Sequence, residues 1–267
     1  MSKLRQPAVF DPLPSGHARI DTHTRDYPPR HVIGLHFHDR DQLVYASRGV
    51  MTIRTEAGVW VVPTHRAVWI PASVPHTIAM SGTVAMRTLY LKPGLAVSMP
   101  RDCCVVNISP LLRELILHAC TCGALYQRDL RERHLIEVIL DQLVAIQRVP
   151  LRLPALSDPR ALRVCLTLLA NPASPHSLTH ICRGSGASRR TMERLFQQEC
   201  GMTFGKWRQQ LRLMHSMQLL GAGAKVTHAA LEAGYSTPSA FIAAFRKALG
   251  TTPTAYFAPS SADRTRR

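Results

Sequence analysis

One pattern occurs twice in the C-terminal part of this chain, with an offset of 49 residues. Ser188 begins the first copy and Thr237 begins the second, while Gly201 and Gly250 follow their ends. Ser and Thr cap helix N-termini because the hydroxyl oxygen accepts a hydrogen bond from a free backbone N–H, and glycine adopts the left-handed conformation that ends many helices. Two capped segments at a fixed offset are hard to obtain by chance, so we predict two equivalent structural units.

Each copy predicts the second helix of a helix-turn-helix unit. In the first copy, Met192, Leu195 and Phe196 recur with helical spacing and form one apolar face. A shorter apolar segment precedes this helix, and the glycine-containing break 184–186 separates the two, which is the helix-turn-helix layout. Further residues that correspond between the copies are Met192 and Phe241, Phe196 and Phe245, Thr203 and Thr252, and Trp207 and Tyr256.

The outer face of the first predicted recognition helix is rich in arginine, the side chain best suited to phosphate and to the O6/N7 edge of guanine. We expect Arg190 and Arg194 to reach guanine and Arg189 to contact the backbone of the DNA. Glu193 would accept a hydrogen bond from cytosine or repel phosphate in wrong registers. The alternative is a solvated face without DNA contact. The candidate DNA-binding residues of this helix are Arg189, Arg190, Glu193, Arg194 and Gln197.

Residues from about 160 to 257 resemble the tandem helix-turn-helix domain of the AraC/XylS family of bacterial transcription regulators. The resemblance covers roughly the last two fifths of the chain. It implies that one long helix, near 204–220, joins two units that read successive major-groove segments of double-stranded DNA. The residues that carry it are Arg212, Leu213, Leu219, Leu220, Ala229, Ala230, Gly234, Tyr235, Phe241, Phe245, Arg246, Lys247, Gly250, Pro253 and Tyr256.

The second recognition helix differs from the first at its outer positions. Ala243 stands where family members often carry an arginine that reads a base. The resemblance therefore implies that the first unit supplies most of the base specificity and that the second mainly anchors on phosphate. The candidate DNA-binding residues of the second helix are Ser239, Ile242, Arg246 and Lys247.

The charge distribution agrees with a polyanionic partner. Residues 151–267 contain 16 Lys and Arg against 5 Asp and Glu, a net charge of +11, whereas residues 1–150 contain 17 against 12, a net charge of +5. A generally basic proteome is the alternative explanation. The chain shows neither a signal peptide nor an apolar stretch near the roughly 18 residues that span a membrane, so we expect a soluble, cytoplasmic protein without membrane association.

Residues 31–93 contain short apolar runs separated by turns, which predicts an all-β sandwich or barrel. The preceding residues 1–30 are rich in proline and are predicted to be an irregular arm. Predicted turns include Arg48-Gly49 and Ser81-Gly82. The strand candidates are 32–37, 42–46, 50–55, 59–62, 66–70, 77–80 and 86–91.

This stretch resembles the small cupin barrel found at the N-terminus of many AraC/XylS regulators. The residues that carry the resemblance are His36-Phe37-His38, Gln42, Gly49 and the segment 71–76, which ends in His76. In metal-binding cupins the corresponding positions hold two histidines, a glutamate and a third histidine. His36 and His38 alternate on a strand, so both can face the barrel interior, and imidazoles suit a first-row divalent metal.

Two departures from the cupin pattern matter. Gln42 replaces the usual glutamate, so one anionic ligand is missing, and Ser73 stands where cupins usually have glycine. Three interpretations stay open at this point: a divalent metal on His36, His38 and His76, a metal-free ligand pocket lined by these residues and Gln42, or hydrogen-bonded core histidines.

Residues 109–147 have helical periodicity, with two apolar stripes. These stripes either pack on the barrel or, as the resemblance implies, form the contact of a homodimer. The first stripe is Leu111, Leu112, Leu115, Ile116 and Ala119, and the second is Leu135, Val138, Ile139, Gln142, Leu143 and Ile146.

The sequence thus predicts an α+β chain of two domains. The expected boundaries are 1–108 for the cupin-like ligand-sensing β domain, 109–150 for the helical dimerisation region and the start of the linker, 151–160 for the linker, 161–258 for the tandem helix-turn-helix domain and 259–267 for a disordered basic tail. The expected function is sequence-specific transcription regulation without catalytic residues, with a small-molecule effector or a metal in the barrel modulating DNA affinity. The alternatives are a ligand-independent regulator and a cupin metalloenzyme fused to a DNA-binding domain.

Overall fold

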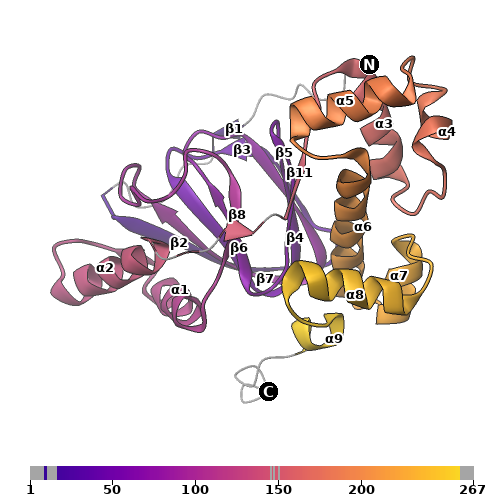
Figure 1. Cartoon of the computed structure of the whole chain (residues 1–267). Helices are drawn as coiled ribbons and strands as arrows, with labels where there is room; N and C mark the ends of the chain where they lie inside the picture. Colours follow the sequence, from indigo (N-terminus) through magenta and orange to yellow (C-terminus); the bar gives the residue numbers. More distant parts are fainter. Residues whose placement is uncertain (1–8, 11–16, 145, 147, 150, 259–267) are drawn as a thin grey trace. The chain divides into compact units, whose positions relative to one another are not determined.

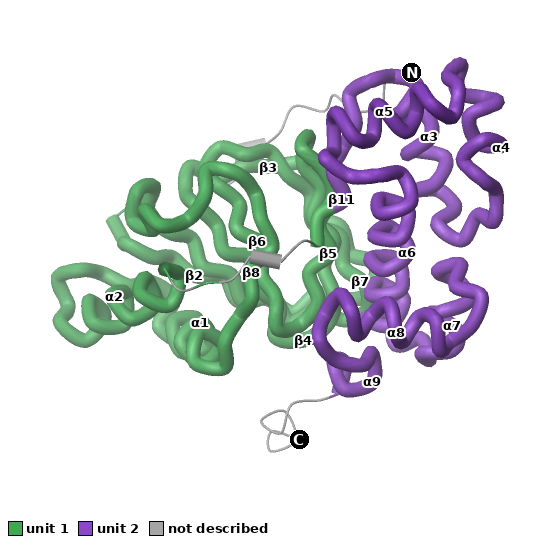
Figure 2. Tube along the Cα trace, in the orientation of Figure 1, with its two compact units in different colours: residues 1–152 green, residues 153–267 purple. Residues whose placement is uncertain are grey.

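The computed structural model describes residues 9–10, 17–144, 146, 148–149 and 151–258 (Figure 1). The predicted basic tail 259–267, residues 1–8 and 11–16 of the predicted N-terminal arm and residue 150 at the start of the linker lie outside the described residues. The chain divides into two compact units, residues 1–152 and residues 153–267 (Figure 2). The first unit is a sheet with two helices and the second is helical, which confirms the predicted α+β class with two domains.

Two long strands organise the sheet of the first unit. β7 pairs with β2, β3 and β4, and β4 also pairs with β5 and β6. These pairs are all antiparallel, whereas β1 runs parallel to β3. The strands are β1 (Val9–Phe10), β2 (Ile20–Tyr27), β3 (Val32–Phe37), β4 (Asp41–Thr55), β5 (Gly58–Val62), β6 (Arg66–Ile70), β7 (His76–Leu91), β8 (Cys104–Asn107), β9 (Ala124–Leu125), β10 (Arg148–Val149) and, at the boundary of the units, β11 (Arg152–Pro154).

The strand predictions need two corrections. The predicted irregular arm is wrong over Val9–Phe10, which forms β1 beside β3, and over Ile20–Tyr27, which forms β2. The polar Thr and His side chains of β2 hide its pairing with β7. The predicted turns at 48–49 and 81–82 are also wrong. Gly49 has a φ of +84° but lies within β4, where the register with β7 shifts, so this glycine allows a bulge and not a chain reversal.

Two helices, α1 (Pro110–Cys122) and α2 (Leu130–Val144), pack on one face of this sheet. The side chains buried there are Leu112 and Ile116 of α1 and Ile139 and Leu143 of α2. Burial of each such side chain contributes about 2 kcal/mol to the stability of the fold. The same cluster contains Ile20, Leu43, Tyr45, Trp69, Leu89 and Leu91 from the strands. The barrel-packing interpretation of the two stripes is therefore confirmed for their inner residues.

The second unit contains the two predicted helix-turn-helix pairs, α4 with α5 and α7 with α8, and α6 runs between them (Figure 1). No helix among the described residues is both long and apolar enough to cross a membrane. The helices are α3 (Pro159–Ala170), α4 (Leu178–Cys182), α5 (Arg189–Cys200), α6 (Phe204–Gly221), α7 (Val226–Glu232), α8 (Pro238–Leu249) and α9 (Pro253–Tyr256).

The 49-residue repeat is visible in the caps of the two recognition helices. The Ser188 hydroxyl accepts a hydrogen bond from the Thr191 backbone N–H, and the Thr237 hydroxyl accepts one from Ala240. At the other end, Gly201 and Gly250 adopt φ angles of +67° and +80°, the left-handed conformation that the sequence predicts. This part of the prediction is confirmed.

The repeat also extends to an aromatic pair behind each recognition helix. Phe196 of α5 meets Trp207 of α6 edge to face, with ring centroids 5.5 Å apart. Phe245 of α8 meets Tyr256 of α9 in the same arrangement at 5.6 Å. Such edge-to-face pairs add about 1 kcal/mol beyond the burial of their surface. Both recognition helices are thus held against the next helix by the same contact.

Candidate ligand-binding site and DNA interface

Three histidines meet inside the first unit. His36 lies on β3, His38 directly follows that strand, and His76 begins β7 opposite His36. Their candidate ligand nitrogens all lie within 4.8 Å of one another, and the residues are only 7 %, 2 % and 1 % exposed. The structure therefore brings together the three histidines that the sequence singles out.

Backbone carbonyls fix the tautomers of two of these rings. The Nδ1 atoms of His36 and His76 lie 2.8 Å from the Gly34 oxygen and 2.9 Å from the Val74 oxygen. A carbonyl oxygen only accepts, so each Nδ1 carries a proton, and Nε2 is the nitrogen that offers a lone pair in the neutral ring. Burial lowers the pKa of His76 to about 3, so this ring is neutral at physiological pH.

Gln42 and Tyr90 adjoin the three histidines. Gln42 on β4 stands opposite Tyr90 on β7, and its Nε2 donates a hydrogen bond of 3.1 Å to the Tyr90 hydroxyl. The Tyr90 ring lies 4.8 Å from the ring of His38. Sequence reasoning missed Tyr90, because a tyrosine in a mostly apolar strand is expected in the core; only the cross-strand register places it at this site.

The donor atoms fit a divalent metal ion. The Nε2 of His76 and the Oε1 of Gln42 are buried and have no hydrogen-bond partner among the described residues. Buried lone pairs without a donor are costly and call for an explanation. A first-row divalent ion accepts imidazole nitrogen and carbonyl oxygen, and a hydrogen bond from the other ring nitrogen is what usually orients metal-binding histidines.

Ser73, the second departure from the cupin pattern, lies next to this site. Its φ is +64°, a left-handed conformation that favours glycine, and its backbone N–H donates a hydrogen bond of 2.7 Å to the carbonyl of His38. The turn before β7 is thereby attached to the histidine pair of β3. Serine thus occupies a backbone position that favours glycine.

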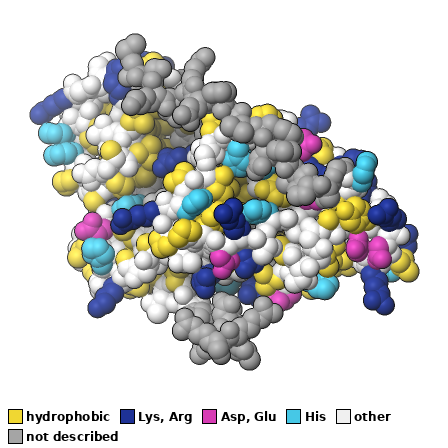
Figure 3. Space-filling view, turned by 180° about the vertical axis from the view of Figure 1, so that it is seen from behind, with side chains coloured by type: hydrophobic (Ala, Val, Ile, Leu, Met, Phe, Trp, Pro, Cys, Tyr) yellow, Lys and Arg dark blue, Asp and Glu magenta, His cyan; other side chains and the backbone are white. Residues whose placement is uncertain are grey.

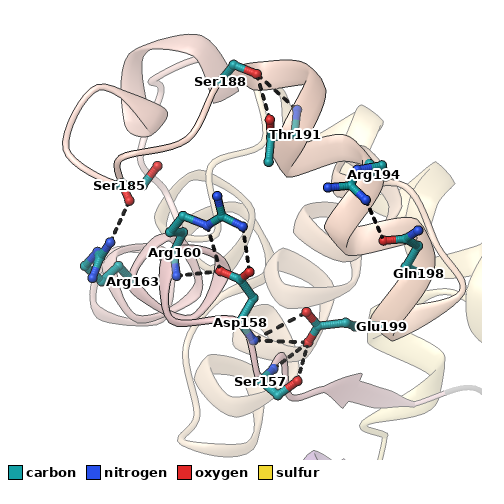
Figure 4. A network of polar contacts seen from close by, with 10 residues as sticks. All are labelled: Ser157, Asp158, Arg160, Arg163, Ser185, Ser188, Thr191, Arg194, Gln198 and Glu199. Atoms are coloured by element: carbon teal, nitrogen blue, oxygen red, sulfur yellow. Dashed lines mark hydrogen bonds and ion pairs between the residues drawn. The ribbon is translucent and has the colours of Figure 1, made fainter.

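On the DNA-binding unit, all candidate residues of α5 are exposed. Arg190, Arg194 and Gln197 are spaced four and three residues apart, so they form one stripe along the helix. The Arg194 guanidinium donates to the Gln198 side chain at 3.4 Å (Figure 4). Arg189 donates to Glu193 at 2.9 Å. Glu193 thus has a partner within its own helix, which the sequence did not predict.

A shallow groove lies beside each recognition helix, and the two grooves correspond in the repeat. Glu193 and Thr203 line the first groove at the positions that Ile242 and Thr252 take in the second. All four candidates of α8 line the second groove, whereas only Arg189 and Glu193 of the α5 candidates line the first. The second groove is formed by Ser239, Ile242, Ala243, Arg246, Lys247 and Thr252.

Basic side chains are not confined to the recognition helices. On the face seen in Figure 3, Lys and Arg side chains are scattered among hydrophobic and uncharged ones and do not form a single patch. A DNA contact therefore depends on where the recognition helices present their arginines, in addition to the net charge of +16.

Comparison with known families and proteins gives consistent results for both units. Residues 20–147 match the model of the AraC-like ligand binding domain, and residues 181–258 match the model of a helix-turn-helix domain. The chain is 35% identical over 224 residues to the HTH-type transcriptional regulator NimR of Escherichia coli (strain K12). This match covers 84% of this chain and 82% of that protein.

Two further similarities concern parts of the chain. The HTH-type transcriptional regulator RipA of Corynebacterium glutamicum is 34% identical over 110 residues, or 41% of this chain and 33% of that protein. The crystal structure of the DNA-binding domain of AdpA in complex with a target DNA is 28% identical, with a TM-score of 0.37, and the match covers 42% of this chain and 100% of that one.

Proposed function

Because this chain belongs to the AraC family of transcription regulators, we propose that a divalent metal ion held by His36, His38 and His76 modulates the affinity of its helix-turn-helix domain for double-stranded DNA. The observation that carries this proposal is the cluster of three buried histidines, whose candidate ligand nitrogens lie within 4.8 Å of one another. A purely structural role would leave the buried His76 Nε2 and Gln42 Oε1 without a partner among the described residues.

The chain's own residues explain why metal would matter to the fold of the sensor. His36 lies near the end of β3, His38 directly follows that strand and His76 begins β7, so one ion would join the two strands. The ion would supply positive charge and coordination positions for further ligands. Such binding changes DNA affinity only if the ion binds the DNA-competent and DNA-free states with different affinity.

The exposed sides of α1 and α2 support a homodimer contact as part of this proposal. Leu111 and Val138 remain 53 % and 41 % exposed although both belong to the predicted apolar stripes. Exposed apolar side chains on neighbouring helices are typical of interaction surfaces. A dimer would present two DNA-binding units to two half-sites.

We further propose a division of labour between the recognition helices. Arg190 makes no hydrogen bond or ion pair with any described residue, so its guanidinium is available for guanine. The second helix offers Ser239 and Ile242 but only Ala243 at the third outer position, which supports contacts mainly to phosphate through Arg246 and Lys247.

The test begins with selection of a preferred duplex from random DNA by the full-length protein loaded with Co²⁺, followed by anisotropy titrations of that duplex. We expect the affinity to change by roughly tenfold between Co²⁺ and EDTA for the wild type. His76→Ala should abolish this response, whereas the exposed His118→Ala should retain it. A response that survives His76→Ala would contradict the proposed metal centre.

The division of labour is tested with Arg194→Ala and Arg246→Ala in the same titrations. Arg194→Ala should relax base preference at one position. Arg246→Ala should lower affinity for all sequences and reduce the salt slope by about one unit. Equal effects of the two changes on base preference would rule out the proposed division.

A further inference from the structure

We infer that the histidine site takes a small anionic oxygen ligand, such as a carboxylate, as its effector, because the protein donors around a bound dication carry no charge. This inference rests on the metal centre proposed above and identifies the chemical class of molecule that would complete it.

The charge count begins with the donors themselves. The rings of His36 and His76 donate from Nδ1 to backbone carbonyls, which leaves both imidazoles able to bind a cation as neutral ligands. The neighbouring Gln42 is an amide and brings no charge either. Its NH₂ group donates to the Tyr90 hydroxyl, and this contact leaves the carbonyl oxygen as the unpartnered end of the side chain. Tyr90 is therefore a positioning residue for that amide.

Carboxylates near the site do not supply the missing charge. Among the described residues, no Asp or Glu joins the cluster of three histidines. Asp21 stands opposite Tyr90 on β2, but it is buried and paired with the Arg40 guanidinium at 3.2 Å. Asp41 neighbours Gln42 in β4, so it projects to the other face, where it accepts a hydrogen bond from the backbone N–H of Ala72.

A buried dication with only neutral ligands is electrostatically unfavourable. Moving charge from water into a protein interior is costly unless an opposite charge accompanies it. In a metal site the ion is the largest local charge and attracts anions accordingly. An anionic ligand from solution would offset this cost, so metal and anion should each strengthen the binding of the other.

Two buried donors on the same face of the sheet would suit an anion. Thr88 lies two residues before Tyr90 on β7 and projects to the same face, and its hydroxyl oxygen has no partner among the described residues. Trp60 on β5 pairs with Ile53 on β4, and Ile53 pairs with Ile78 on β7. Directly paired residues point to the same face of a sheet, and Ile78 lies two residues after His76, so Trp60 is on the face of His76. The Trp60 indole N–H is buried and likewise unpartnered.

The experiment is a Co²⁺ titration of the full-length protein, followed by visible absorption and calorimetry, in a buffer with a weakly coordinating anion. The titration is repeated with acetate and with inorganic phosphate as probes. We expect acetate to tighten Co²⁺ binding by roughly tenfold or more and to change the absorption spectrum of the ion, and Co²⁺ to tighten acetate binding by the same factor. If phosphate has the same effect as acetate, the site accepts anions in general. If only acetate has an effect, the site fits a carboxylate.

Gln42→Glu provides the missing negative charge within the protein. This variant should bind Co²⁺ more tightly than the wild type without any added anion, and its acetate effect should shrink to about threefold or less. Gln127→Glu, an exposed glutamine in the same unit, is the matched control and should behave like the wild type. Should Gln42→Glu fail to fold, the wild-type titration still decides the question.

The outcomes separate the two proposals. Tight Co²⁺ binding that neither acetate nor phosphate alters would overturn the anionic effector and leave the metal centre standing. A full acetate effect in Gln42→Glu would also overturn it, because the charge at this position would then be irrelevant. Absence of Co²⁺ binding by the wild type would overturn both.

Discussion

The carboxylate of Glu199 accepts two hydrogen bonds from Ser157, one from its backbone N–H at 2.5 Å and one from its hydroxyl at 2.8 Å (Figure 4). Glu199 lies near the end of the recognition helix α5, and Ser157 directly precedes Asp158, the N-cap of α3. The indole N–H of Trp207 adds a bond of 3.2 Å to the Pro154 carbonyl. The segment that enters the DNA-binding unit is thus attached to the first helix-turn-helix.

Replacing Glu199 by Gln should loosen this attachment. The amide keeps the shape but loses the charged acceptor, and at this exposed position we expect a loss of at most about 1 kcal/mol. Hydrogen exchange of the backbone amides in 153–158 should accelerate severalfold. Glu193→Gln, on the same helix and hydrogen-bonded to Arg189 alone among the described residues, is the control. Unchanged exchange in Glu199→Gln would show that the contact with Ser157 does not stabilise this segment.

Acid should weaken the same attachment. Burial raises the pKa of Glu199, but hydrogen bonds from Ser157 outweigh this effect and hold the pKa below its ordinary value of 4.5. The stabilisation is therefore complete above pH 4.5 and is lost as the pH falls below it through the folded-state pKa. Between pH 5 and pH 3, urea unfolding should show a larger loss of stability for the wild type than for Glu199→Gln. If the stability of the two proteins changed equally with pH, the Glu199 carboxylate would not be the group responsible.

Gly234→Ala should destabilise the second unit. Gly234 has a φ of +81°, and an added Cβ would lie 2.8 Å from the Cα and 3.1 Å from the oxygen of Ala173. We expect about 1 kcal/mol for the backbone conformation and a further 1–3 kcal/mol for the overlap. Gly223 has a φ of +90° with open space around it, so Gly223→Ala should show the backbone cost alone in thermal unfolding. If both variants lost the same stability, the overlap with Ala173 would cost nothing and this prediction would be wrong.

Val138→Asp should shift the proposed homodimer towards monomers. The side chain is exposed within one chain, so the charge should leave the stability of the isolated fold nearly unchanged while disrupting an apolar contact between two copies. Light scattering across a concentration series measures the association. Leu231→Asp, at another exposed apolar position in α7, should leave it unchanged. A dimer that tolerates Val138→Asp would place the contact elsewhere.

The sequence by itself determined what depends on neighbours along the chain. Ser188, Gly201, Thr237 and Gly250 cap their helices through hydrogen bonds and backbone angles that span only a few residues, so the repeat predicted both recognition helices with nearly correct bounds. The alternation of His36 and His38 is equally local. The third histidine and Gln42 came from a resemblance to a known pattern and not from local periodicity.

Only the tertiary structure decided the relations between distant strands and helices. The position of Tyr90 opposite Gln42, the inclusion of Ile20–Tyr27 in the sheet and the hydrogen bonds between Glu199 and Ser157 join residues that are far apart in sequence. Each follows from strand register or helix packing, which is set by the burial of whole faces and not by the preference of any single residue. Local pattern therefore predicted the elements, whereas packing fixed which polar groups meet inside the sensor and around the recognition helix.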